Sequence, residues 1–316
     1  MVRIGALVPL SRPGWVEAGR HLLAGLELGA RERSWELVVR DTAADPRRAE
    51  AAVEEFAALG VAAVVGEYHS VVAQAAAARA DALRLPFLCS SAVLDALTDG
   101  PTEWVARLPP PQSRGWRVYA EFLRGAGHRR VAVVTQPSVY WASGVRVLRE
   151  HLDAVVELDG SADEVVASGA TALLLLVGHP EPAVSIVESL RRDERLAGLL
   201  IGAPAGQPEF WPTLPGIPFL RYLSTLGPLG TRVEAELRER LGEAPSFVAF
   251  EGYDSIAVLA EALRSGGSWS EVDVEGTRGR IRFSRTPGVW QWEGAPVQVV
   301  DRDPTAPDRF RVLHTG

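Results

Sequence analysis

The stretch with the clearest potential for binding chemistry is a polar turn, Glu67-Tyr68-His69-Ser70, which follows an apolar run that stops at Gly66. A serine at the start of a helix can cap it, and the N–H groups of the first helical turn are free to meet a ligand oxygen. Ser70 and Tyr68 are therefore candidate ligand contacts. The alternative is a structural role, in which Ser70 only caps its helix and Tyr68 only covers the end of the strand.

Other candidates lie in loops that are expected to follow strands. Trp15 ends the loop after the first apolar run, and Ser91 follows the run that includes Cys89. Tyr140 and Trp141 are adjacent in a later loop, so we expect one of them to pack while the other faces a ligand. Aromatic side chains can cover a small ligand and a serine can hydrogen bond to it, so these residues are further candidate ligand contacts. For Ser91 a plain turn is an equal alternative.

The residues needed for several common reactions are missing. The sequence contains no lysine, which excludes a P-loop, a Schiff-base lysine and a Ser-x-x-Lys nucleophile. The motifs GxSxG, HExxH and CxxC are absent, and the glycines around Gly202 and Gly206 do not form GxGxxG. His69 and His179 have no companions at metal-ligand spacing. We therefore predict no catalytic residue, no metal and no cofactor, and a dinucleotide-dependent enzyme is the weakest alternative.

Charge and composition limit the partners. The formal net charge of -7 argues against direct nucleic-acid binding, because phosphates require a concentrated basic face. No apolar run approaches the length needed to cross a membrane, and the N-terminus lacks the features of an export signal. As the sequence stands we expect a cytoplasmic protein, or an extracytoplasmic one if a leader has been removed. Cys89 is the only cysteine, so no intrachain disulfide can form.

Apolar runs alternate with segments of helical composition, and this order occurs twice along the chain. The spacing predicts parallel strands joined by crossover helices in each half. In the first half the predicted strands are Ile4–Leu10, Leu37–Arg40, Val61–Val65, Pro86–Cys89 and Trp104–Arg107. In the second half they include Val131–Thr135, Ala154–Leu158, Ala172–Val177 and Leu199–Gly202. We therefore predict an α/β fold with two Rossmann-like lobes of parallel sheet and a cleft at the strand ends.

Proline and glycine breaks suggest where the chain passes between the lobes. The run Pro109-Pro110-Pro111 and the pair Gly227-Pro228 mark the first two passages, and a third is expected near Gly276. The predicted N-terminal lobe comprises residues 1–112 and 227–276, and the C-terminal lobe comprises residues 113–226 and 277–316. The alternating pattern of the tail predicts antiparallel strands. The lobes are thus joined by a three-segment hinge.

The order of these motifs resembles the type I periplasmic-binding fold, in particular the leucine/isoleucine/valine-binding and amide/urea-binding solute receptors. The motifs that carry the resemblance span nearly the whole chain. They are Ile4 to Leu10, Gly19 with Gly25, Asp41 with Asp45-Pro46, Gly66 with Ser70, the Tyr140 loop, Gly252-Tyr253-Asp254 and Gly279 to Phe283. The local pattern Gly66-x-Tyr68-x-Ser70 looks most like the cytoplasmic amide-sensing regulator of amidase operons, and the run Arg79 to Leu83 strengthens that likeness.

The resemblance implies a non-catalytic protein that binds a small polar ligand, either an amide, a urea-like molecule or an amino-acid-like one. It would be the substrate-binding component of an ABC transporter, with a permease as partner, or a related sensor. The alternative is a cytoplasmic amide-sensing regulator that controls a partner protein by lobe closure, and a homodimer stays open. By position, Ser70 resembles the hydroxyl that receives the ligand's carboxylate or amide oxygen, and Tyr140 resembles the aromatic residue that closes over it.

Two positions depart from the amino-acid receptors. Val93 stands where those receptors usually have a hydroxyl, and Ala205 replaces the glutamate that pairs with the ligand's ammonium. An unpaired buried ammonium costs several kcal/mol, so we expect neutral amides to bind better than zwitterions. The exception would be a charge supplied by Glu67, Glu181 or Glu209.

Overall fold

The computed structural model describes residues 1–98, 100–178, 180–205, 215–284, 286 and 288–316, apart from the side chains of residues 307 and 308. The chain forms two compact units, each made of two segments. The first unit comprises Met1–Pro111 and Tyr222–Pro296, and the second comprises Gln112–Arg221 and Val297–Gly316. Each unit contains a parallel sheet with crossover helices, which confirms the predicted α/β fold class.

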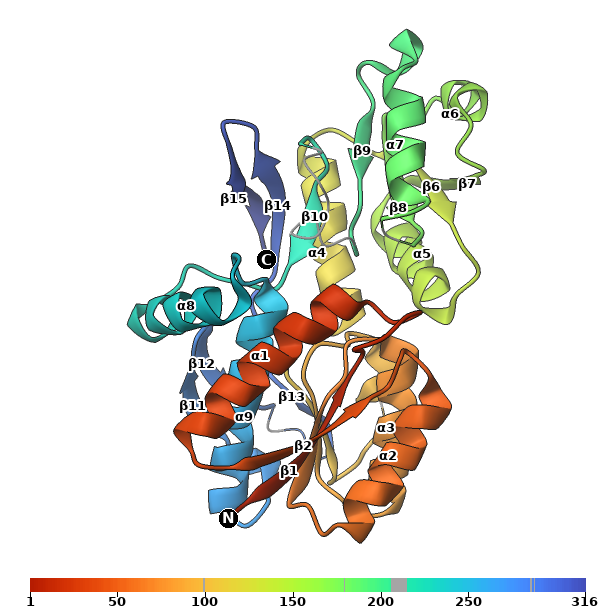
Figure 1. Ribbon diagram of the computed structural model, residues 1–316. Coiled ribbons are helices and arrows are strands. Elements are labelled where there is room, and N and C mark those ends of the chain that lie inside the picture. Colours follow the sequence, from red (N-terminus) through yellow and green to blue (C-terminus); the bar gives the residue numbers. More distant parts are fainter. Residues whose placement is uncertain (99, 179, 206–214, 285, 287) are drawn as a thin grey trace. The chain divides into compact units, whose positions relative to one another are not determined.

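The first unit is built on a six-stranded sheet in the order β13-β5-β4-β3-β1-β2, and every pairing in it is parallel. The strands are β1 (Arg3–Val8), β2 (Glu36–Asp41), β3 (Ala63–Gly66), β4 (Phe87–Cys89), β5 (Val105–Arg107) and β13 (Trp290–Gln291). Helices α2 (Pro46–Ala58) and α3 (Ser70–Ala82) cover one face, and α1 (Val16–Glu32) and α9 (Phe247–Arg264) cover the other (Figure 1). Helix α8 (Pro228–Leu241) packs beside α1 and α9.

Local sequence explains how these elements begin and how closely they pack. Asp45 caps α2 by accepting from the Arg47 N–H at 2.8 Å, and Pro46 occupies the first helical turn, as the sequence predicts. Helices α1 and α9 approach closely because glycines meet at their contact. A side chain at Gly25 would lie 1.9 Å from the Ala249 carbonyl oxygen. The buried faces of β1, β3, α2 and α3 form one apolar core.

The second unit contains a parallel sheet in the order β7-β6-β8-β9 and a separate antiparallel sheet in the order β10-β14-β15. The strands of both sheets are β6 (Arg130–Thr135), β7 (Ala154–Leu158), β8 (Ala172–Leu176), β9 (Leu200–Gly202), β10 (Phe219–Arg221), β14 (Gln298–Asp303) and β15 (Ala306–Thr315). Its helices are α4 (Gln112–Gly125), α5 (Val139–His151), α6 (Ala162–Ser168) and α7 (Ala183–Arg191). The parallel sheet and α7 share an apolar core.

The predicted lobe boundary after Gly276 is wrong for residues 277–296, which belong to the first unit. The hairpin of β11 (Asp273–Gly276) and β12 (Gly279–Arg282) delivers Arg278 to two buried carboxylates of α9. Strand β13 then pairs with β5 in parallel, whereas the sequence pattern predicted antiparallel strands for this part of the tail. Only Val297–Gly316 joins the second unit, where β14 and β15 are antiparallel as expected.

Within the described ranges, no helix combines the length and the apolar character required to span a bilayer.

Candidate functional site

The turn after β3 is organised by Glu67, whose carboxylate is fully buried. It accepts a hydrogen bond from the Thr42 hydroxyl at 2.7 Å and from the backbone N–H groups of Tyr68 and His69, both at 2.9 Å. These contacts join the loop after β2 to the loop after β3. Hydrogen bonds to a charged group are among the stronger ones in proteins, so this carboxylate holds the backbone of the turn. Its oxygens are directed to the turn itself.

His69 links this turn to the loop that ends at Trp15. Its Nδ1 lies 3.2 Å from Glu67 Oε1, and its Nε2 lies 3.3 Å from the backbone nitrogen of Trp15. Because an amide N–H can only donate, Nε2 acts as the acceptor and we assign the ring proton to Nδ1, facing Glu67. Sequence analysis treated His69 only as a loop residue. The sequence feature that could have indicated this contact is the short spacing between Glu67 and His69.

Trp15 and Tyr68, two of the predicted ligand contacts, lie together in the first unit. Their ring centroids are 5.8 Å apart in an edge-to-face arrangement, and the rings of Tyr68 and His69 are 5.2 Å apart. All three side chains are half-buried, so each keeps some accessible surface. Edge-to-face aromatic pairs contribute about 0.5–1.5 kcal/mol beyond the area that they bury. The pair therefore forms a supported aromatic surface after the strand ends.

Ser70 is the first residue of α3, and the cap position belongs to His69. The prediction of an N-cap serine is therefore shifted by one residue, because His69 has the extended backbone that a cap requires. The Ser70 hydroxyl is half-buried and makes no hydrogen bond within the described parts of the chain. It lies in the turn whose N–H groups lack helical acceptors. Gly66 is required at the end of β3, because its φ is +122° and a side chain there would meet the Leu7 carbonyl at 2.0 Å.

Ser91 does not join this group. Its side chain is buried and its hydroxyl donates to the carboxylate of Glu251 in α9. The alternative of a structural role therefore describes Ser91 better than ligand contact does. The neighbouring backbone is tied to the turn, since the N–H of Ser90 donates to the Gly66 carbonyl at 2.9 Å and that of Ala92 to the Glu67 carbonyl at 3.2 Å.

Behind Ser91 lies a fully buried ionic cluster that the sequence did not reveal. Arg278 donates to Asp254 at 2.9 Å and to Glu251 at 3.2 Å. Burial raises the pKa of Glu251 to about 7, against the opposing effects of Arg278 and Ser91. Burial also raises the pKa of Asp254, although Arg278 and Thr277 act in the opposite direction. With both carboxyls ionised, one guanidinium faces two negative charges.

The predicted aromatic pair of the second unit lies in the loop after β6, which by strand order corresponds to the loop after β1. Ser138 caps α5 by accepting from the backbone N–H of Tyr140 at 3.2 Å, and the side chain of Gln112 donates to the Tyr140 carbonyl at 2.9 Å. Tyr140 and Trp141 have ring centroids 4.8 Å apart, and Trp116 of α4 lies 6.2 Å from Tyr140 and 6.4 Å from Trp141. The predicted pair thus belongs to a trio of aromatic rings.

Trp116 is the residue of this trio that sequence analysis missed. It is fully buried, and a side chain at Gly144 would lie 2.3 Å from its ring, so the glycine in α5 provides its space. Tyr140 and Trp141 are half-buried above it. Burial raises the pKa of the Tyr140 phenol, so it is a neutral hydrogen-bonding group at ordinary pH. The available signal was the Gln112-to-Trp116 spacing at the start of a helix.

The structure also shows the surroundings of the residues that could determine the charge of the ligand. Val93 is 5% exposed and Ala205 is half-buried. Glu67 is directed into its own turn, and Glu181 accepts from the Ser185 hydroxyl at 2.6 Å. Glu209, together with His179, lies outside the described residues. In the described part of the chain, no three His, Cys, Asp or Glu side chains are grouped so that they could hold a metal ion.

Two α/β units joined by three chain passages, with polar and aromatic side chains after the strand ends, define a class of ligand-binding proteins. Residues 1–286 match the family described as periplasmic binding protein, and the chain belongs to that family. The predicted resemblance is thereby confirmed. Comparison with curated proteins gave no match.

Solved structures give the same fold. The leucine-binding protein LivK of Thermotoga maritima has a TM-score of 0.83 at 19% identity, covering 100% of this chain and 98% of its own. The branched-chain amino acid transporter substrate-binding protein LivJ of Streptococcus pneumoniae, in complex with isoleucine, has a TM-score of 0.83 at 19% identity and covers 99% of both chains. An ABC transporter solute-binding protein of Rhodopseudomonas palustris, in complex with 3,4-dihydroxybenzoic acid, has a TM-score of 0.83 at 15% identity, covering 100% of this chain and 97% of its own.

Proposed function

We propose that this protein is a non-catalytic, substrate-binding component of an ABC transporter and that its ligand is a small polar molecule without an ammonium group. Family membership and the fold shared with transporter-associated binding proteins support the first part. The permease of such a transporter would be its protein partner. In this role the protein acts outside the cytoplasm.

The observation that carries the proposal is the half-buried Ser70 hydroxyl at the start of α3, which has no hydrogen-bond partner among the described residues. It closely follows Tyr68, whose ring packs on that of Trp15. The buried Glu67 carboxylate and the His69 side chain hold the backbone of the turn that precedes Ser70. A ligand oxygen can therefore be met by a hydroxyl and by N–H groups of regular structure, at little reorganisation cost. In the second unit, Tyr140 and Trp141 are proposed as further ligand contacts, supported on Trp116.

The charge of the ligand follows from the acids near the proposed contacts. Glu67 is occupied by its own turn, Val93 and Ala205 offer no charge, and Glu181 is exposed and accepts from Ser185. A buried ammonium would therefore lack a buried partner among these residues, at a cost of several kcal/mol. Neutral amides carry no ammonium group and therefore avoid this cost. Aromatic carboxylates do so too, and the Rhodopseudomonas palustris protein holds one of them, 3,4-dihydroxybenzoic acid.

The alternative is a cytoplasmic amide-sensing regulator, which the local pattern Gly66-x-Tyr68-x-Ser70 favours. It would recognise the same ligand chemistry but transmit binding to a regulatory protein. Neighbouring genes separate the two roles, because permease and ATPase genes accompany transport whereas amidase or regulator genes accompany sensing.

Calorimetry with aliphatic amides, ureas, benzoate and leucine tests the ligand class. An amide or aromatic acid is expected to bind, and at 100 times its dissociation constant it should add about 2.7 kcal/mol to the free energy of unfolding. Micromolar binding of leucine with no response to any ammonium-free compound would contradict the proposal.

The ligand found in that screen then tests the contacts. Ser70→Ala should weaken binding by about one to two decades, because it removes a hydrogen bond of roughly 1–3 kcal/mol. Ser189→Ala, which changes an exposed serine of α7, is the matched control and should bind as the parent does. Tyr140→Ala should speed ligand dissociation with little change in association. Unchanged affinity in Ser70→Ala would place the ligand elsewhere.

A further inference from the structure

The first unit contains a cavity at the end of its sheet opposite the Ser70 turn. A cavity of about 420 Å³ is lined by Pro86, Glu103, Trp104, Leu263 and Trp269, together with the backbone around Gly267. Pro86 and Trp104 precede β4 and β5, whereas Ser70 follows the end of β3. Because these strands are parallel, the cavity lies at their N-terminal ends and the Ser70 turn lies at their C-terminal ends. Its volume falls in the range of small-molecule sites.

The chain that follows α9 forms one side of this cavity. Gly266 and Gly267 have φ values of +74° and +88°, and a side chain built on either would meet nothing within 4 Å. The N–H of Gly267 donates to the Ala262 carbonyl at 2.8 Å, which fixes the turn. The short helix Trp269–Glu271 then places Trp269, whose ring packs 6.0 Å from that of Phe283. The opening is thus part of ordered structure.

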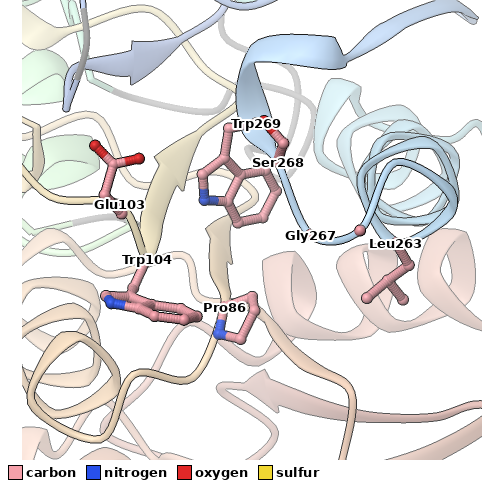
Figure 2. Close-up of a pocket in the computed structure, with 8 residues that line it drawn as sticks. Pro86, Glu103, Trp104, Leu263, Gly267, Ser268 and Trp269 are labelled. Carbon is pink, nitrogen blue, oxygen red and sulfur yellow. The ribbon is translucent and has the colours of Figure 1, made fainter.

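The other side of the cavity, around Trp104, is also held by hydrogen bonds. Backbone hydrogen bonds place Trp104, since its N–H donates to the Thr102 hydroxyl at 3.0 Å and its carbonyl accepts from the Phe87 N–H at 2.8 Å. Thr102 in turn donates to Asp81. Figure 2 shows the Trp104 ring nearly edge-on below Trp269, with one indole face turned toward Trp269, and both residues line the cavity. The face of an indole carries the negative part of its quadrupole and attracts cations.

The charged residue at the cavity is negative, as is the face of the indole. Glu103 is exposed, and its carboxylate makes no ion pair or hydrogen bond among the residues that the structure describes. Figure 2 shows this carboxylate beside the two tryptophans. Two indoles and one unpaired carboxylate favour a cation with an apolar surface over an anion or a neutral hydrocarbon.

The indole N–H of Trp269 adds a second requirement for the ligand. The side chain is 2% exposed, and its indole N–H has no hydrogen-bond acceptor within the described chain. Figure 2 shows the ring nitrogen on the side that faces Glu103. A buried donor without an acceptor is unfavourable, so an oxygen close to the cation of a ligand would be stabilised there once the ring shifts to admit it.

From these features we propose that the cavity binds a quaternary or methylated ammonium compound that carries an oxygen near its cationic centre, with choline as the simplest probe. The cation lies against the Trp104 face beside Glu103. The site is separate from the proposed ligand-binding turn, which excludes ammonium groups. It would give the protein a second, chemically opposite ligand.

Titration calorimetry of the full chain with choline chloride tests this proposal, with 3,3-dimethylbutan-1-ol as the neutral isostere and sodium chloride at matched ionic strength. Choline is expected to bind in the millimolar range or tighter, and the isostere about tenfold more weakly, because it lacks the charge. Tetramethylammonium, which lacks the hydroxyl, should bind between the two. Equal binding of choline and its isostere, or no binding of either, would overturn the proposal.

Variants locate the site. Trp104→Ala should abolish measurable choline binding, and Glu103→Gln, a conservative change at an exposed position, should weaken it several-fold. Trp35→Ala, at a half-buried tryptophan that does not line the cavity, is the matched control and should leave it unchanged. Ser70→Ala should also leave it unchanged, so failure here and failure of the proposed function are distinguishable. Choline binding that survives both Trp104→Ala and Glu103→Gln would refute this location.

Discussion

The turn after β3 in the first unit and the loop after β6 in the second each join a strand of a parallel sheet to a helix, yet they are stabilised by different means. Glu67 fixes the first through hydrogen bonds from Thr42 and from the backbone. Trp116 supports the second through packing, with one serine cap. A polar network defines the orientation of hydrogen-bonding groups, whereas a cluster of edge-to-face and tilted rings defines a surface. The first loop is thus suited to orient a ligand oxygen and the second to cover an apolar part.

Removing the ring that supports the second loop should have the largest effect. Trp116→Ala deletes a fully buried indole and is expected to lower the free energy of unfolding by about 3–5 kcal/mol, measured by chemical denaturation. Trp116→Phe should lose less, because it keeps part of the ring packing. A loss below about 1 kcal/mol would show that this loop does not depend on Trp116.

Removing the carboxylate that holds the first loop should cost somewhat less. Glu67→Ala leaves the Thr42 hydroxyl and two backbone N–H groups without their acceptor, for an expected loss of about 2–3 kcal/mol. Glu50→Ala, at an exposed position of α2, is the control and should change stability little. If Glu67→Ala were as stable as the control, the polar network would be dispensable.

Dependence on pH should distinguish the units, because the buried carboxyl cluster belongs to the first. The pKa of Glu251 is about 7 in the folded protein, above its ordinary value of 4.5, so the folded state binds the proton more tightly. Its contribution to stability is greatest below pH 4.5 and is lost as the pH rises through 7. We expect a decrease of roughly 1–3 kcal/mol across this interval.

Glu251→Gln isolates this effect. Glutamine resembles the protonated carboxyl, so the variant should lose most of the decrease and keep the part that comes from Asp254, whose pKa burial also raises. Thermal unfolding of both proteins from acid to neutral pH measures the difference. Burial lowers the pKa of His21, which gives a slope of opposite sign in both proteins and cancels in the comparison. Parallel profiles for parent and variant would exclude Glu251 as the titrating group.

The smallest effect concerns the cap of the second loop. Ser138→Ala removes the acceptor for the Tyr140 N–H and should cost about 1 kcal/mol of stability, measured by denaturation. Ser138→Asp should restore most of it, because a carboxylate can also cap the helix. A loss as large as that of Trp116→Ala would mean that capping, and not packing, holds this loop.

The parts of the site that lie close together in the sequence could be predicted. Strand periodicity placed Tyr68 and Ser70 after one strand, and Tyr140 with Trp141 after another, because strand, loop and helix are local patterns. The buried contact of Ser91 could not be predicted in this way. Its partner, Glu251, lies in α9, which is 160 positions away in the sequence, and no local pattern reports such a contact.

The error in the tail has a similar origin. Strand β13 contains only two residues, too few for any periodicity to indicate its partner. Arg278 looks like a surface arginine in the sequence, because its burial depends on the two carboxylates that α9 presents to it. Pairing of charges across distant segments is a property of the folded chain, and it overrides the usual preference of arginine for solvent.

The late position of β13 also matters for biosynthesis. Strand β5 forms its outer pairing with Trp290 and Gln291, although it is itself complete at Arg107. During translation, the outer edge of β5 therefore stays unpaired until residues 112–289, which include the whole segment Gln112–Arg221, have been made. An exposed strand edge can pair with another chain, so a nascent protein that stalls in this interval carries an edge that can aggregate. Chaperone dependence should accordingly be set by the delay before residue 291 emerges.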